Sequence, residues 1–191
     1  MITHRNRRGD LYYLHEGKSK TGKPKYLFSR KPGGTLAVAI PPGFEVYENP
    51  DAQVFLRRVI PSPVRADEMH AVFAAVRKNA KARNAIVETK GDAIVVFMPD
   101  TDVDEATEEL VAMSPFADRA RIRSVLEHSL RFSPMMRFVL QDEKTRKYWT
   151  ERWYCLGSNP GWMNIGAPGP LPRLVRQFCR HLGKESFFEL I

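Results

Sequence analysis

The first residues of the chain include a group of side chains whose chemistry suits phosphate binding. Lysine and arginine side chains neutralise phosphates, and tyrosine rings offer flat surfaces on which nucleic-acid bases stack. Tyrosines lie among the basic residues of this segment. We therefore predict a nucleic-acid-binding surface made of Arg5, Arg7, Arg8, Lys18, Lys20, Lys23, Lys25, Arg30, Tyr12 and Tyr26.

The formal charge of the chain is concentrated in the same segment. Nine of the thirty lysines and arginines lie within residues 1–31, where only Asp10 and Glu16 oppose them, so this segment carries +7 of the net +8. A local excess of positive charge attracts a polyanion, whereas charge needed only for solubility can be spread over the chain. The expected partner is DNA or RNA, or another polyanion, bound without strong base readout. Alternatively, the aromatic residues pack into a small sheet and the lysines only hydrate a loop.

The triplet Glu88-Thr89-Lys90 follows an apolar run and precedes a turn. It is similar to the acid-x-Lys triplet of metal-dependent nucleases of the PD-(D/E)xK type, whose carboxylate binds a divalent cation while the lysine stabilises charge at the scissile phosphate. Such a site needs another acid upstream, but Asp67 and Glu68 are predicted to lie on a helix. A nuclease is therefore a less favoured alternative to a non-catalytic binding protein.

A run of acids offers oxygen ligands at alternate positions: Asp100, Asp102, Asp104, Glu105, Glu108 and Glu109. It lacks the central glycine and closing glutamate of an EF-hand loop. We expect these acids to pair with the next predicted helix, through Arg119, Arg121 and Arg123. The five histidines show no paired ligand spacing, so neither a metal nor another cofactor is predicted.

Aromatic residues gather again near the end of the chain. Trp149, Trp153 and Trp162 lie within fourteen residues, and Phe187 and Phe188 follow in the tail. Such residues usually belong to a core, but a tryptophan in a loop and two phenylalanines in a free tail would form an exposed apolar surface. The main alternative function is therefore a protein-protein interaction or an oligomeric adaptor.

Hairpins and helices are the elements expected to position these residues. Alternating apolar residues between turn residues predict hairpins at residues 10–29, 44–60, 85–98 and 135–156. Residues 157–170 are rich in glycine and proline and are predicted to form a loop. This pattern, with about four helices between the hairpins, indicates an α+β fold with mainly antiparallel sheet.

Helical spacing predicts helices at about residues 66–80, 101–113 and 114–130, and an amphipathic C-terminal helix. Thr101 and Asp104 resemble a capping box for the second helix. Ser114-Pro115 is predicted to begin the third, with Ile122, Val125 and Leu126 facing inward. The apolar stripe of the last helix is Leu171, Leu174, Val175, Phe178, Cys179 and Leu182.

The expected organisation is a basic N-terminal arm and hairpin at residues 1–34, followed by a single α+β domain at residues 35–191. No apolar stretch follows the basic start as it would in a leader, and no apolar run approaches twenty residues. We therefore expect a cytoplasmic protein without membrane contact. The favoured function is non-catalytic binding of nucleic acid through the arm and hairpin.

Overall fold

The computed structural model of the chain describes residues 1–114, 116–156 and 159–190. Within these residues there are four α-helices and eleven strands, and the sheets are antiparallel, so the fold is α+β as predicted. The chain forms two compact units, Met1–Ile60 and Pro61–Ile191. None of the described helices is long and apolar enough to cross a membrane.

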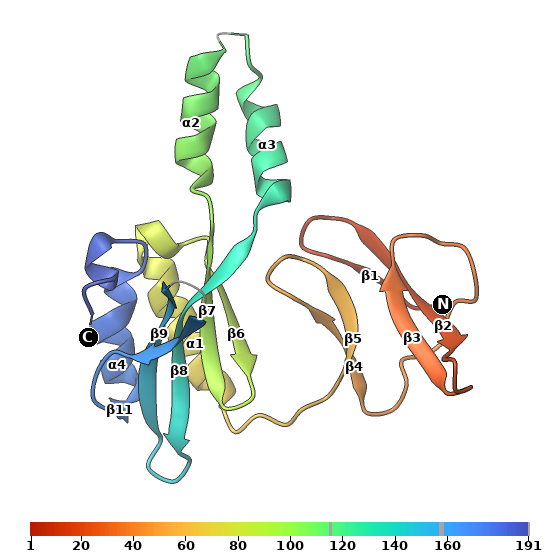
Figure 1. Cartoon of the computed structure of the whole chain (residues 1–191), viewed down its shortest axis with the longest axis horizontal. Helices are drawn as coiled ribbons and strands as arrows, with labels where there is room; N and C mark the ends of the chain where they lie inside the picture. Colours follow the sequence, from red (N-terminus) through yellow and green to blue (C-terminus); the bar gives the residue numbers. More distant parts are fainter. Residues whose placement is uncertain (115, 157–158, 191) are drawn as a thin grey trace. The chain divides into compact units, whose positions relative to one another are not determined.

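The first unit is made of short antiparallel strands, drawn red to orange in Figure 1. A three-stranded sheet has the order β1-β2-β3, and β4 pairs with β5. The strands are β1 (Thr3–Arg5), β2 (Leu11–Lys18), β3 (Pro24–Ser29), β4 (Phe44–Glu48) and β5 (Val54–Arg58). Because β3 also lies against β5, the unit continues past residue 34, the predicted end of the arm and hairpin. That domain boundary stays a prediction.

The N-terminal segment belongs to the sheet and is not a loose arm. Strand β1 pairs with β2, and the backbone N–H of Ile2 donates to the carbonyl of Ala37 at 3.1 Å. The side chain of Asn6 is buried and donates to the carbonyl of Ala52 at 2.8 Å. Leu14 is fully buried at the centre of β2. Residues far apart in sequence therefore hold the basic N-terminus in place.

The second unit is a sheet of order β10-β9-β8-β7-β6, with the short β11 paired to β9. Figure 1 shows the long strands of this sheet side by side. The strands are β6 (Ile86–Lys90), β7 (Ala93–Pro99), β8 (Phe132–Asp142), β9 (Lys147–Leu156), β10 (Asn159–Asn164) and β11 (Gly169–Pro170). Strand β10 lies within the predicted loop of residues 157–170. Its pairing with β9 is what makes this glycine- and proline-containing segment a strand.

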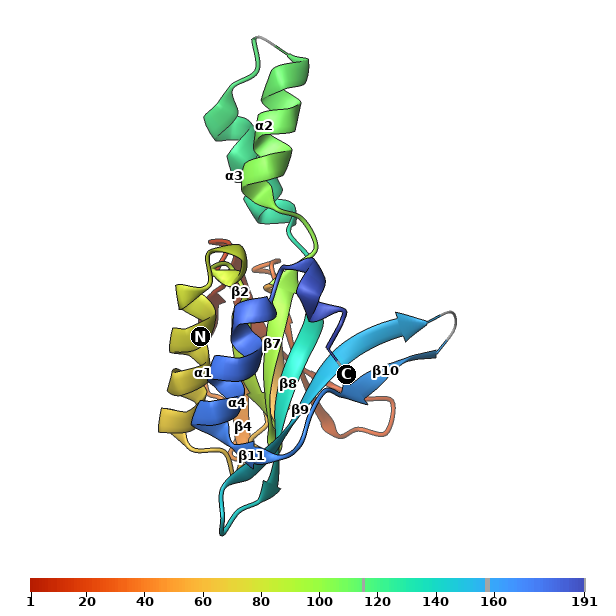
Figure 2. The same ribbon diagram turned by 90° about the vertical axis from the view of Figure 1, so that its left-hand side faces the viewer.

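Helices α1 (Ala66–Lys78) and α4 (Leu171–Phe178) cover one face of this sheet, as Figure 2 shows. Alternate residues of β7 explain the two faces, since Ile94 and Val96 join the core under the helices while Val95 and Phe97 join a smaller cluster on the opposite face. The predicted burial of the C-terminal stripe is confirmed, because all six of its residues are at most 6% exposed. The helix itself ends at Phe178, so Cys179 and Leu182 lie beyond it.

Three short 3₁₀ turns complete this layer: Ala80–Ala82, Cys179–His181 and Glu185–Phe187. The chain turns after the second of them at Gly183, which has φ +73°. A Cβ atom there would lie 2.9 Å from Cβ of Lys81, so both the backbone angle and the available space require glycine.

A helical hairpin connects β7 to β8 and extends beyond the end of the sheet (Figure 1). Its helices are α2 (Val103–Met113) and α3 (Arg119–Ser129). The N-cap of α2 is Asp102, which accepts from the N–H groups of the first turn, and Thr101 is not the cap. Asp118 caps α3 in the same way, so this helix begins later than predicted. Pro115 lies outside the described residues.

Candidate nucleic-acid interface

Four lysines of the predicted site surround the end of the β2–β3 hairpin, and we call them the hairpin lysines: Lys18, Lys20, Lys23 and Lys25. Register pairs Lys18 with Pro24 and Gly17 with Lys25, while the other two lie in the turn. Paired residues of a sheet project to the same face and successive residues to opposite faces. Lys18 and Lys25 therefore project from opposite faces of the hairpin.

The backbone of the turn is held by Ser19. Its N–H donates to the carbonyl of Lys23 at 2.8 Å, and its hydroxyl accepts from the N–H of Lys23 at 3.1 Å. Gly22 donates to the carbonyl of Ser19 at 2.9 Å and has φ +78°, a conformation that favours glycine. These bonds position the turn that carries Lys20 and Lys23 before any ligand binds.

All four hairpin lysines are exposed. In the described residues no carboxylate lies within 4.0 Å of any of their amines, so none forms an ion pair. The nearest acid along β2 is Glu16, and its carboxylate accepts instead from the hydroxyl of Tyr26 at 3.2 Å. The positive charge at this end of the hairpin therefore faces water.

The arginines of the predicted site lie at the opposite end of the same hairpin. Arg5 pairs with Leu11 at the start of β2, and Arg30 follows the end of β3. Seven strand steps separate Leu11 from Lys18, about 23 Å at the usual rise. The predicted arginines and the hairpin lysines therefore lie at opposite ends of the β2–β3 hairpin.

Internal contacts engage most of these arginines. Arg7 Nε lies 3.0 Å from Oε1 of Glu48, and Arg30 Nη1 lies 3.6 Å from Oδ1 of Asp10. Arg5 is exposed and donates to the carbonyl of Gly9 at 2.5 Å. Arg8 is half-buried in the turn between β1 and β2. Arg7 and Arg30 thus have internal counter-charges, which the hairpin lysines lack.

The two predicted stacking residues project from the same face of the hairpin as the buried Leu14. Tyr12 and Glu16 each lie two residues from the buried Leu14 on β2, so all three side chains project to the same face. Tyr26 pairs with Glu16 and projects to that face too. Both tyrosines are half-buried. Partial burial and the Glu16 carboxylate raise the pKa of Tyr26 above its ordinary value. Both rings are therefore only partly accessible.

The nuclease-like triplet lies at the end of β6, where Lys90 is close to Glu88 and to an aromatic ring. Lys90 Nζ lies 3.9 Å from Oε2 of Glu88 and 4.5 Å from the centre of the Phe97 ring. Glu68 instead accepts from the backbone of Arg65 and pairs with Arg146 at the start of α1. In the part of the chain that the structure describes, no three His, Cys, Asp or Glu residues are placed to hold a metal ion.

Part of the acidic run pairs internally: the predicted pairing with the next helix is confirmed for Arg119 and Arg123, whereas Arg121 forms no ion pair within the described residues. Asp104 accepts from Arg83 at 2.5 Å and from Arg123 at 2.6 Å, and Glu108 pairs with Arg119. Hydrogen bonds from the two guanidinium groups hold the pKa of Asp104 below its ordinary value.

The aromatic residues near the C-terminus mostly contact one another. Trp162 lies on β10 and not in a loop, with its ring edge-on to Trp153 at 5.1 Å and the Arg137 guanidinium 4.4 Å from its centre. The tail folds back, so that Phe187 is fully buried while Phe188 stays 60% exposed. The predicted pair of free phenylalanines is therefore wrong for Phe187.

Phe188 borders an apolar hollow of about 700 Å³. The other residues that line it are Met135, Arg152, Trp153, Tyr154, Trp162 and Met163.

No protein family matches the chain, and neither a curated protein nor a solved structure shows significant similarity to it.

Proposed function

We propose that this protein binds nucleic acid through the β2–β3 hairpin, with the hairpin lysines contacting phosphates. The observation that carries the proposal is the absence, within the described residues, of any carboxylate within 4.0 Å of these four exposed amines. An unpaired surface lysine keeps its full charge for a ligand. Each phosphate contact then releases a counterion, which supplies affinity without base readout.

The distribution of the lysines favours double-stranded DNA as the ligand. Lys18 and Lys25 project from opposite faces of a two-stranded ribbon, with Lys20 and Lys23 at its end. The major groove of B-DNA is about 12 Å wide and admits such a ribbon, with phosphates along both walls. A single strand would meet only one face. The deep, narrow major groove of RNA duplexes would exclude the ribbon.

The test compares two variants with the same change in net charge. In the hairpin variant Lys18, Lys20, Lys23 and Lys25 are replaced by glutamine. In the control variant four exposed lysines of the second unit are replaced by glutamine: Lys78, Lys81, Lys144 and Lys184. Fluorescence anisotropy measures their binding to labelled duplex DNA, duplex RNA and single-stranded DNA, and circular dichroism confirms that both variants fold.

The wild type and the control variant should bind duplex DNA alike and more tightly than the other two ligands. The hairpin variant should bind duplex DNA about 100-fold more weakly at low salt, since about four phosphate contacts are lost. Equal loss in the two variants would show that net charge alone matters, and unchanged binding by the hairpin variant would refute the proposed contact. Stronger binding to single strands would refute the groove geometry but not the hairpin.

A further inference from the structure

The α2–α3 hairpin is poorly covered by the rest of the second unit. None of the residues of α3 is buried, and only Val103 and Thr107 are buried in α2. Each helix has 11 residues. Helices shorter than about 12 residues are marginal in water without tertiary packing. This hairpin therefore presents helices that need a further surface to pack against.

The two sides of the seam between these helices differ in chemistry. On one side, ion pairs join the two helices: Arg119 of α3 pairs with Glu108 of α2, and Arg123 of α3 pairs with Asp104 of α2. Helical geometry places apolar residues on the opposite side, Leu110 and Met113 from α2 with Ile122 and Val125 from α3. One side is thus closed by ion pairs and the other is apolar.

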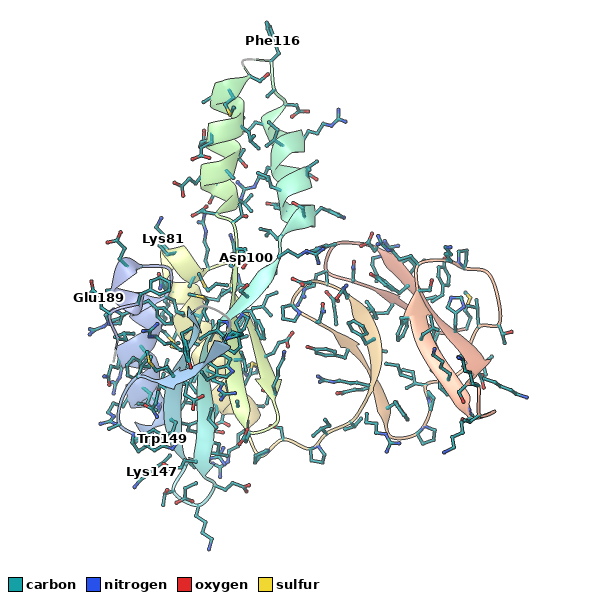
Figure 3. The ribbon with its side chains drawn as sticks, viewed as in Figure 1. Lys81, Asp100, Phe116, Lys147, Trp149 and Glu189 are labelled. Carbon is teal, nitrogen blue, oxygen red and sulfur yellow. The ribbon has the colours of Figure 1, made fainter. Side chains whose placement is uncertain are left out.

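The apolar side is accessible in the described structure. Leu110 is 42% exposed, Met113 82% and Val125 61%. Phe116, in the connection between the helices, is 99% exposed and points away from both of them in Figure 3. Apolar side chains gathered in this way on a projecting element are characteristic of an association surface.

Charge indicates what covers this surface. Helix α2 carries Asp104, Glu105, Glu108 and Glu109 and no basic residue, while α3 carries Arg119, Arg121 and Arg123 against Glu127. Within the described residues, Glu109 and Arg121 form no ion pair. The hairpin is therefore complementary in charge to another copy of itself.

We propose that two copies of this chain associate through the apolar sides of their α2–α3 hairpins to form a four-helix bundle. A twofold axis parallel to the helices places the acidic α2 of each copy over the basic α3 of the other, and brings Glu109 near Arg121 of the second copy. A twofold axis perpendicular to the helices would instead place α2 of one copy over α2 of the other, so that their acidic side chains would repel. The inference is independent of the proposed DNA contact, because the hairpin belongs to the second unit.

The first test compares two exposed valines. Val125→Asp places a charge in the proposed interface, and Val38→Asp changes a valine that is 81% exposed in the first unit. Sedimentation equilibrium of nuclease-treated protein covers about 1 to 100 μM, a range that brackets micromolar dissociation constants. The wild type and Val38→Asp should form dimers. Val125→Asp should weaken the dimer at least about 100-fold, because the symmetry introduces two buried charges.

Exchanging the two charges distinguishes a direct contact between Glu109 and Arg121 of two copies from a loss of folding. Arg121→Glu alone and Glu109→Arg alone should each dissociate the dimer, because like charges then meet twice. An equimolar mixture of the two variants should recover dimers, since both contacts of the mixed pair join opposite charges. A monomeric wild type, a dimer unaffected by Val125→Asp, or a mixture that stays monomeric would each overturn the proposal.

Discussion

The β2–β3 hairpin and the α2–α3 hairpin are both rich in charged side chains, but they differ in what neutralises those charges. In α2–α3, Asp104 and Glu108 meet arginines of the facing helix. In β2–β3, the hairpin lysines lack ion pairs within the described residues. Charge density alone therefore does not identify a binding surface. Charges with internal partners stabilise the fold, and only charges without them remain for a polyanion.

The largest loss of stability is expected when the ion pair between Glu68, at the start of α1, and Arg146 is broken. Their side chains are only 11% and 19% exposed. Glu68→Gln leaves Arg146 without its carboxylate and should lower the free energy of unfolding of the second unit by about 2 to 3 kcal/mol at neutral pH. All three tryptophans lie in this unit, so their fluorescence during urea unfolding reports the loss. Lys144→Gln, an exposed change nearby, serves as the control.

The same pair predicts a pH dependence. Burial raises the pKa of Glu68, but hydrogen bonds from Arg146 and the Arg65 backbone outweigh it and lower the pKa overall. The pKa of Glu68 is lower in the folded than in the unfolded protein. The ion pair therefore contributes fully to the free energy of unfolding above the ordinary glutamate pKa, and this contribution is lost as pH falls through the folded pKa. The stability difference between wild type and Glu68→Gln should therefore shrink on acidification. A difference that persists at low pH would mean that the ion pair is not its cause.

A smaller effect is expected in the α2–α3 hairpin, where the paired charges are exposed. Asp104→Asn removes the charge that Arg83 and Arg123 share, so the two helices should open more often. Amide hydrogen exchange in residues 103–113 and 119–129 should become about fivefold faster, with exchange in β8 unchanged. Dilute protein avoids protection by self-association. Unchanged exchange would show that these ion pairs do not hold the helices together.

The smallest effect is expected for arginines of the first unit that already have partners. Arg7→Gln and Arg30→Gln should each leave affinity for duplex DNA within about twofold of wild type, because Glu48 and Asp10 already neutralise these side chains. Anisotropy titrations beside a single Lys23→Gln variant measure this. A loss for Arg7→Gln as large as that for Lys23→Gln would break the distinction between paired and unpaired cations.

Much of the fold could be predicted because its signals are local. The stripe from Leu171 to Leu182 repeats at helical spacing, and the hairpins combine alternation with turn residues. Strand β10 was missed because its partner β9, which pairs Trp153 with Trp162, decides its conformation. Helical spacing predicts that Val125 lies on the apolar face of its helix, but it does not show what covers that face. Val125 is 61% exposed and does not face inward as predicted.

The candidate site could be predicted only in part for the same physical reason. Within the described part of the chain the lysines near the turn form no ion pair, because the local sequence offers them few acids. The counter-charge of Arg7 is Glu48, 41 residues away, and pairing at that distance depends on tertiary structure. Strand β2, from Leu11 to Lys18, separates the predicted arginines from the hairpin lysines. The count of basic residues in this segment does not reveal that separation.

The dependence of duplex DNA affinity on salt tests the central claim most directly. If each of the four hairpin lysines neutralises one phosphate, the slope of log affinity against log salt should be less steep by about 3.6 in the hairpin variant than in the wild type, while the control variant keeps the wild-type slope. Equal slopes in the wild type and the hairpin variant would contradict the claim that these lysines bind phosphate.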